Sequence, residues 1–177
     1  MKEINPLNRR GLAVVNLVLK TRPTSSLLLV KKRASPNDPW SFDIGFPGGM
    51  VREGEDPLVA LMRETEEETG ISSSMIEVVA LVGLDKPTIM PGVSIRAYLS
   101  LFLGEHSDFK LDFSEVSEAF WAPLREIKGP VKMYHPFKKR VIEAYVYSHY
   151  IIWGVSKRIL ESALPTLSSL RLGGVSK

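Results

Sequence analysis

Apolar side chains occur along this chain in short runs of strand length, separated by turn-forming residues. The runs GLAVVNLVLK at Gly11–Lys20 and SLLLVKK at Ser26–Lys32 are rich in aliphatic and β-branched side chains. They predict two strands joined by a turn at Arg22-Pro23. Similar runs predict strands over residues 44–46, 75–83, 93–103 and 118–123, and residues 141–153 are dense in aromatic and β-branched side chains.

One segment has the apolar spacing of a helix and signals for both of its ends. Asp56 is a suitable N-cap, Pro57 a suitable first helical residue, and Gly70 fits a left-handed C-cap position. Between them, one helical face collects the side chains expected to pack on a core, which are Leu58, Leu61, Met62, Thr65 and Thr69. The opposite side of this helix is therefore available to a ligand.

A second helical pattern lies near the end of the chain, where Val155, Ile159 and Ala163 recur at helical spacing. Residues 165–177 are weakly patterned, and we expect this tail to be loose. With no internal repeat or linker, residues 1–177 predict a single domain. Strands combined with helices predict an α/β or α+β fold.

Composition narrows the class of protein. Hydrophobic residues are 44% and charged residues 24% of the chain, and the formal charge is only +3, so neither disorder nor nucleic-acid binding is indicated. The absence of cysteine excludes disulfides and thiolate metal sites. No apolar run is long enough to span a bilayer, and the polar start MKEINPLNRR does not resemble a signal peptide. These features predict a cytoplasmic protein without membrane contact, and they leave its oligomeric state open, a homodimer included.

Three glutamates form an acidic stripe on the first helix. Glu64, Glu67 and Glu68 have i, i+3 and i+4 spacing, and at ~100° per residue they share one helical face. Like charges at this spacing repel each other and cost helix stability. A cation that neutralises them is the simplest explanation, and carboxylate oxygens suit a hard divalent ion such as Mg²⁺ or Mn²⁺.

The whole segment 49–71, GMVREGEDPLVALMRETEEETGI, resembles the Nudix box, G-x5-E-x7-R-E-U-x-E-E-x-G-U, in which U is a bulky aliphatic residue. The matched positions are Gly49, Glu55, Arg63, Glu64, Glu67, Glu68, Gly70 and Ile71, and the only departure is Thr65 at the first U. The resemblance implies a Nudix-type α/β/α sandwich with a mixed sheet. It also implies metal-dependent hydrolysis of a pyrophosphate bond, with Mg²⁺ or Mn²⁺ as the ion.

The resemblance also implies roles for individual residues. Glu64 and Glu68 would be the principal metal ligands, with Glu67 as third ligand or general base. The backbone carbonyl near Gly49 would complete the metal shell. Arg63 and Glu55 would orient the metal ligands without binding the metal themselves.

An extra acidic residue is expected outside the box. Within FSEVSEAFWAPL, Glu115 is an even choice between a catalytic and a surface role, and Glu118 is the weaker candidate. The histidines, at positions 106, 135 and 149, have no metal-ligand spacing and read as structural or exposed.

Substrate recognition lies outside the box. Residues 38–41 (DPWS) before FPGG, and the Ile152-Trp153-Gly154 step, resemble the coenzyme A pyrophosphatase-type Nudix proteins. The Arg-Ser step of that subgroup is replaced by Lys32-Arg33-Ala34-Ser35, and no histidine follows before Phe46. A coenzyme A-like or an ADP-ribose-like substrate is therefore expected, with other nucleoside diphosphate sugars, dinucleoside polyphosphates and nucleoside triphosphates left open.

Substrate-binding candidates are Arg33, Trp40 and Phe46, and the rings of Tyr134 and Phe137 are further candidates for stacking on a base. The basic clusters at residues 31–33 and 138–140 are either solvated surface or a guide for a phosphorylated substrate. The alternative function is a Nudix domain that binds a nucleotide or RNA without hydrolysing it, although such domains commonly lose a box glutamate and this chain keeps all of them.

Overall fold

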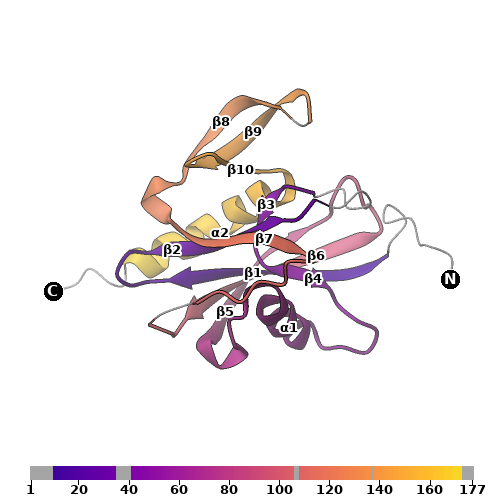
Figure 1. The fold of residues 1–177 in the computed structure, drawn as a ribbon, viewed down its shortest axis with the longest axis vertical. Helices are drawn as coiled ribbons and strands as arrows, with labels where there is room; N and C mark the ends of the chain where they lie inside the picture. Colours follow the sequence, from indigo (N-terminus) through magenta and orange to yellow (C-terminus); the bar gives the residue numbers. More distant parts are fainter. Residues whose placement is uncertain (1–9, 35–40, 106–107, 137, 173–177) are drawn as a thin grey trace.

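The chain folds around a mixed sheet of seven strands, with one helix on each face (Figure 1). The computed structural model describes residues 10–34, 41–105, 108–136 and 138–172. The strands of this sheet are β1 (Gly11–Lys20), β2 (Ser26–Lys32), β3 (Ile44–Gly45), β4 (Gly48–Met50), β5 (Ile76–Asp85), β6 (Val93–Phe102) and β7 (Val116–Pro123). The main path runs β3-β2-β1-β6-β5, while β4 pairs with β1 and β7 pairs with β2. The only parallel pair in the described sheet is β1 with β6, so the sheet is mixed as predicted.

Strand β1 lies at the centre and is buried on both faces. Leu17 and Leu19 belong to the core beneath α2 (Gly154–Leu172), whereas Val14 and Val18 pack on the opposite side, toward α1 (Pro57–Thr69). This alternation follows from the two-residue repeat of a strand and explains why β1 reads as a nearly continuous apolar run. The prediction of an α/β/α sandwich with a mixed sheet is confirmed.

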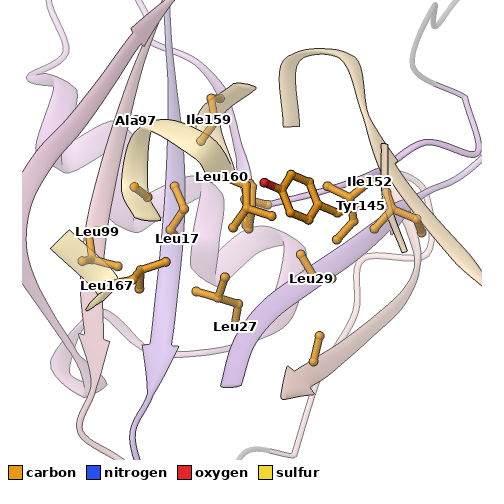
Figure 2. Packing of buried hydrophobic residues seen from close by; sticks show 14 of the residues in the cluster. Leu17, Leu27, Leu29, Ala97, Leu99, Tyr145, Ile152, Ile159, Leu160 and Leu167 are labelled. Atoms are coloured by element: carbon orange, nitrogen blue, oxygen red, sulfur yellow. The ribbon is translucent and has the colours of Figure 1, made fainter. Parts of the chain in front are cut away.

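Helix α2 covers one face with its apolar side. Figure 2 shows Ile159, Leu160 and Leu167 of α2 in one core cluster with Leu17 and Leu99 of the sheet. The prediction of a loose tail from residue 165 is wrong for residues 165–172, which continue α2 through Pro165. Leu167 is 2% exposed, and burying such a side chain contributes about 1.5–3 kcal/mol. This packing opposes the local helix-breaking effect of the proline.

Three further strands form a second, antiparallel sheet of order β10-β9-β8, from β8 (Lys128–His135), β9 (Arg140–Tyr147) and β10 (Tyr150–Trp153). Figure 1 shows the β8–β9 hairpin on the α2 side of the large sheet, with α1 on the other side. The aromatic region at 141–153 is thus a pair of strands. Strand β8 was not predicted, because most of its side chains are exposed and its Gly-Pro step reads as a turn.

The rest of the described backbone consists of loops and two short 3-10 turns, Ser73–Met75 and Leu124–Glu126. No helix in the described part of the chain has the length and apolar character needed to cross a membrane.

A buried polar network joins β1 to helix α1. The Asn16 amide donates to Thr65 Oγ1 at 3.0 Å, and Ser100 Oγ donates to Asn16 Oδ1 at 2.7 Å. Thr65 Oγ1 in turn donates to the Leu61 carbonyl at 2.7 Å. All three polar residues are fully buried. Thr65 departs from the box pattern because its hydroxyl is the partner of a polar residue in the central strand.

Replacing Asn16 with alanine should lower the free energy of unfolding by about 2–3 kcal/mol, since it leaves the buried Ser100 hydroxyl without its acceptor and opens a cavity. Urea unfolding of the two proteins measures this difference. The exposed β6 residue Ser94, changed to alanine, is the control. A loss below about 1 kcal/mol for Asn16→Ala would show that the network is not needed for stability.

Candidate active site

The acidic helix α1 begins and ends where its capping residues predict. The Asp56 carboxylate accepts from the Leu58 amide at 2.8 Å, and Gly70 has φ 74° as the left-handed C-cap. Leu61, Thr65 and Thr69 are buried as expected. Leu58, however, is 43% exposed, so the prediction that it packs on the core is wrong. It lies in the first turn, two residues after the cap.

Arg63 connects the helix to the loop before it. Its Nε donates to Glu55 Oε1 at 2.7 Å and its Nη2 to Glu55 Oε2 at 3.0 Å, which is a bidentate pair. Its Nη1 donates to Glu64 Oε1 at 2.6 Å and to Glu67 Oε2 at 3.0 Å. Nη2 also reaches the Met50 carbonyl at 3.3 Å. One guanidinium therefore sets the positions of three box carboxylates, as a planar donor group can.

The Glu55 carboxyl is strongly acidic because of this pairing. The hydrogen bond from Arg63 and, second, that from the Arg52 amide lower the pKa of Glu55 from 4.5 to about 2. The folded state therefore binds this proton less readily than the unfolded state. The stabilising effect of ionised Glu55 is complete above pH 4.5 and is lost as the pH falls from 4.5 to about 2.

We expect this effect in a comparison of the native protein with Glu55→Gln. In chelator-treated samples, the native protein should be the more stable at neutral pH, and the difference should shrink as the pH falls through the window from 4.5 to about 2. Urea unfolding at a series of pH values measures it, with the exposed Glu53→Gln as control. A difference that stays constant with pH would contradict the ion pair.

Glu68 is the most buried of the box carboxylates, at 1% exposure. Its Oε2 accepts from the Gly48 amide at 3.0 Å, and its Oε1 accepts from the Lys32 ammonium of β2. Burial raises the pKa of Glu68, while Lys32 and the Gly48 amide oppose that rise. Removing a buried carboxylate from water is costly without such partners. Glu68 is thus held in place by the Gly48 amide of β4 and by Lys32 of β2.

Glu64 packs directly against Gly49. A methyl group added at Gly49 would lie 2.3 Å from Glu64 Oε2, so the Glu64 carboxylate would have to move away. Glycine at this position therefore lets that carboxylate lie directly against β4. The structure thus places Gly49 next to Glu64, and their role in binding a metal stays a prediction.

Taken together, the acidic stripe is neutralised by side chains of the protein. Arg63 lies between Glu64 and Glu67, Arg52 also reaches Glu67 at 3.3 Å, and a lysine pairs with Glu68. Within the described residues, no three acidic or histidine side chains converge as a ready-made metal cluster. The donor set nevertheless fits a hard divalent ion, because the carboxylates of Glu64 and Glu68 both lie against the glycine backbone of β4. An ion bound there would share the neutralising role of Arg63, Arg52 and Lys32.

A pocket of about 830 Å³ opens beside the box. Among the described residues its wall includes Glu64, Gly48, Gly49 and Lys32, and it extends to the first turn of α2. Glu115 is exposed and lines the same pocket. The position of Glu115 therefore agrees with a role near the carboxylates, and that role stays a prediction.

Glu118 points to the other face of the sheet. It accepts from Lys31 Nζ at 2.6 Å and from Tyr150 Oη at 2.5 Å, which hold the pKa of its carboxyl below the ordinary value. Tyr150 belongs to β10, on the α2 side. The structure thus gives Glu118 an ion-pair role away from the box, in agreement with its being the weaker candidate.

The other predicted residues are spread more widely. Phe46 is 5% exposed and belongs to the core, and it also lines the pocket. Arg33 donates to the Phe113 carbonyl and is not part of the pocket wall. Tyr134 is 59% exposed on β8. Trp40, Phe137 and His106 lie outside the described residues.

Of the two remaining histidines, His135 packs on Trp153 with ring centroids 5.1 Å apart, and His149 packs on Tyr150. Both contacts agree with the structural reading of these residues.

From the sequence, Lys32 was not expected to lie beside the box carboxylates. Strand alternation separates that cluster: Lys32 shares its face with Leu28 and Val30, toward α1, while Lys31 faces Glu118. Counting along β2 would have placed Lys32 on the opposite face from Lys31, but it does not tell which helix covers that face. No sequence pattern predicts that Trp153, Lys138 and Arg140 line the same pocket. Their common location depends on how the β8–β9 hairpin folds over the large sheet.

Comparisons with known proteins agree with this arrangement. The family model described as NUDIX domain matches residues 9–145. A Nudix hydrolase named NudL from an Enterobacter species is 30% identical over 163 residues, covering 87% of this chain and 81% of the relative. NudL from Salmonella paratyphi B is 28% identical over 160 residues, with the same coverage of 87% and 81%.

Two solved structures have the same fold. A MutT/nudix family protein from Enterococcus faecalis has a TM-score of 0.66 at 20% identity, over 95% of this chain and 66% of that chain. The NUDIX domain of Shewanella oneidensis NrtR, complexed with ADP ribose, has a TM-score of 0.60 at 18% identity, over 90% of both chains.

The fold and the box together define a Nudix hydrolase, and the chain belongs to the Nudix family. It is a pyrophosphohydrolase of this family, an enzyme class whose members generally need a divalent metal ion.

Proposed function

We propose that this enzyme hydrolyses the pyrophosphate bond of a nucleoside diphosphate linked to another moiety, with a coenzyme A-like or ADP-ribose-like compound as substrate and Mg²⁺ or Mn²⁺ as cofactor. The observation that carries the proposal is a pocket of about 830 Å³ whose wall includes both Glu64 and Glu115 and the first turn of helix α2. Its volume lies in the upper part of the range usual for ligand sites. A substrate with two bulky halves fits such a pocket better than a small one.

The box carboxylates hold the metal in this proposal. Glu64 and Glu68 are the main ligands, Glu67 is the third, and the backbone near Gly49 contributes an oxygen. A divalent ion supplies neutralisation of the phosphate charge and polarisation of a phosphoryl oxygen. The rigid support for these ligands is visible in the contacts of Glu64 and Glu68 with β4.

The surrounding side chains attract and orient the diphosphate. Lys32 and Arg52 line the pocket next to Glu64, where their charge draws an anionic substrate toward the carboxylates. Glu67 is 49% exposed and Glu115 is exposed, so either can take a proton from an attacking water. Arg63 acts through Glu55 and Glu64 as a positioning residue.

A panel of nucleoside diphosphate derivatives tests this function. The purified protein is incubated with coenzyme A, ADP-ribose, dinucleoside polyphosphates and nucleoside triphosphates, each with Mg²⁺, with Mn²⁺ or with EDTA. We expect cleavage only with metal, and product masses that place the cut within the diphosphate. Turnover that persists in EDTA, or a cut outside the diphosphate, would refute the proposal. Calorimetric titration with Mn²⁺ gives a second readout that does not depend on having the right substrate.

A further inference from the structure

The wall of the pocket includes a basic corner formed by Lys138, Arg140 and Trp153. Trp153 Nε1 donates to Asp43 Oδ1 at 3.0 Å, which fixes the indole. Lys138 Nζ lies 5.3 Å and Arg140 Cζ 5.6 Å from the ring centroid. Both cations therefore rest on one fixed aromatic ring, at cation–π distance. All three residues line the same pocket as Glu64.

The neighbouring basic residues are neutralised by specific carboxylates. Arg158 forms a bidentate pair with Asp85, both bonds 2.8 Å, and Lys157 pairs with Glu143 at 2.7 Å. Within the described residues, Arg140 has no carboxylate partner. Its charge is therefore available to an anion that enters the pocket.

The local field of this corner is positive. Burial lowers the pKa of His135, and the charges of Lys138 and Arg140 lower it further. Gly154 and Val155, in the first turn of the 19-residue helix α2, line the same pocket, so the positive end of the helix dipole adds to the field. Anionic ligands are thus favoured here by three sources of positive charge, which are Lys138, Arg140 and the amino end of helix α2.

We propose that the basic corner binds a phosphate monoester of the substrate that is separate from the diphosphate being cleaved. The inference rests on the proposed function and makes it narrower: the preferred substrates are nucleoside diphosphate derivatives that carry a further phosphate. Arg140 supplies the planar donor group that matches a phosphate, and Lys138 supplies a second positive charge. The corner lies on the hairpin side of the large sheet, and α1 lies on the other side (Figure 1). One substrate molecule would then contact both the basic corner and the box carboxylates.

Matched substrate pairs test this proposal. Coenzyme A is compared with dephospho-coenzyme A, and ADP-ribose with ADP-ribose 2′-phosphate, so that each pair differs by one phosphate. We expect kcat/KM to be at least about tenfold higher for the phosphorylated member of at least one pair, corresponding to about 1.4 kcal/mol. The variant Lys138→Gln/Arg140→Gln should reduce this ratio to below about twofold. The control is Arg125→Gln, which removes an exposed arginine outside the pocket and should keep the full ratio.

Binding without turnover separates the two proposals. In calorimetry with EDTA, adenosine 3′,5′-bisphosphate should bind the native protein at least about tenfold more tightly than adenosine 5′-monophosphate, and the double variant should lose this difference. Circular dichroism confirms that the variants are folded. If the native protein cleaves both members of each pair equally well, or the double variant keeps the ratio, the phosphate site is refuted while the hydrolase survives. If no member is cleaved with either metal, the proposed function itself fails.

Discussion

Glu68→Gln and Glu64→Gln should each lower kcat/KM by a factor on the order of 10²–10³, with the folded structure retained. Both side chains are fixed against β4, Glu68 by the Gly48 amide and Glu64 by contact with Gly49. Glutamine keeps their shape but removes the negative charge that, in the proposed function, holds a divalent ion. Steady-state kinetics with the best substrate of the panel, at saturating Mg²⁺ or Mn²⁺, measures the loss.

The helix offers its own control for this experiment. Glu66 lies on the same helix between the box glutamates, is exposed, and has no place in the box. Glu66→Gln should therefore change kcat/KM by less than about twofold, because exposed surface substitutions rarely matter. Glu67→Gln and Glu115→Gln, measured beside it, distinguish the two candidates for the general base: only the base variant should flatten the acidic limb of the pH–rate profile. Wild-type activity of Glu64→Gln and Glu68→Gln would remove the metal site from the stripe.

Gly48→Ala should cost at least about 3 kcal/mol of stability, beyond the usual cost of one added methyl group in a core. The new Cβ would lie 2.2 Å from the Val14 carbonyl oxygen and 2.9 Å from the Val15 Cα. Both atoms belong to the backbone of the central strand, which cannot move aside as a flexible side chain can. Relieving the clash would separate β4 from β1 and remove the Gly48 amide from Glu68. Urea unfolding monitored by circular dichroism measures the change.

Gly54→Ala is the matched comparison, since Gly54 lies in a loop with φ 74° and nothing within 4 Å of an added Cβ. Its cost should be limited to the left-handed backbone, about 1–2 kcal/mol. If Gly48→Ala does not fold alone, unfolding of chelated and Mn²⁺-loaded samples shows whether metal binding rescues it. Equal costs for the two variants would contradict the steric argument.

The box helix was predictable from sequence in nearly every detail. Its caps at Asp56 and Gly70 and the burial of Leu61, Thr65 and Thr69 appear in the structure, while Leu58 is exposed. These features are local, so spacing along the chain determines them. Strand β1 was predicted equally well, because its burial on both faces produces a continuous apolar run in the sequence. The mixed sheet followed from the family resemblance and not from the pattern alone.

The features that sequence did not predict depend on contacts between distant segments. Helix α2 continues past Pro165 because Leu167 packs on the sheet. Strand β8 is recognisable only through its pairing with β9. The pairing of Lys32 with Glu68, 36 positions apart, needs the sheet to bring β2 beside α1. No local propensity encodes any of these contacts.

The hairpin formed by β8 and β9 leads through β10 directly into α2, while the carboxylates are supported by β2, β4 and α1. Substitutions in the hairpin can therefore accumulate without disturbing the cleavage chemistry. Exchanging the hairpin between related enzymes should therefore change the substrate preference while the hydrolysis of the diphosphate stays the same.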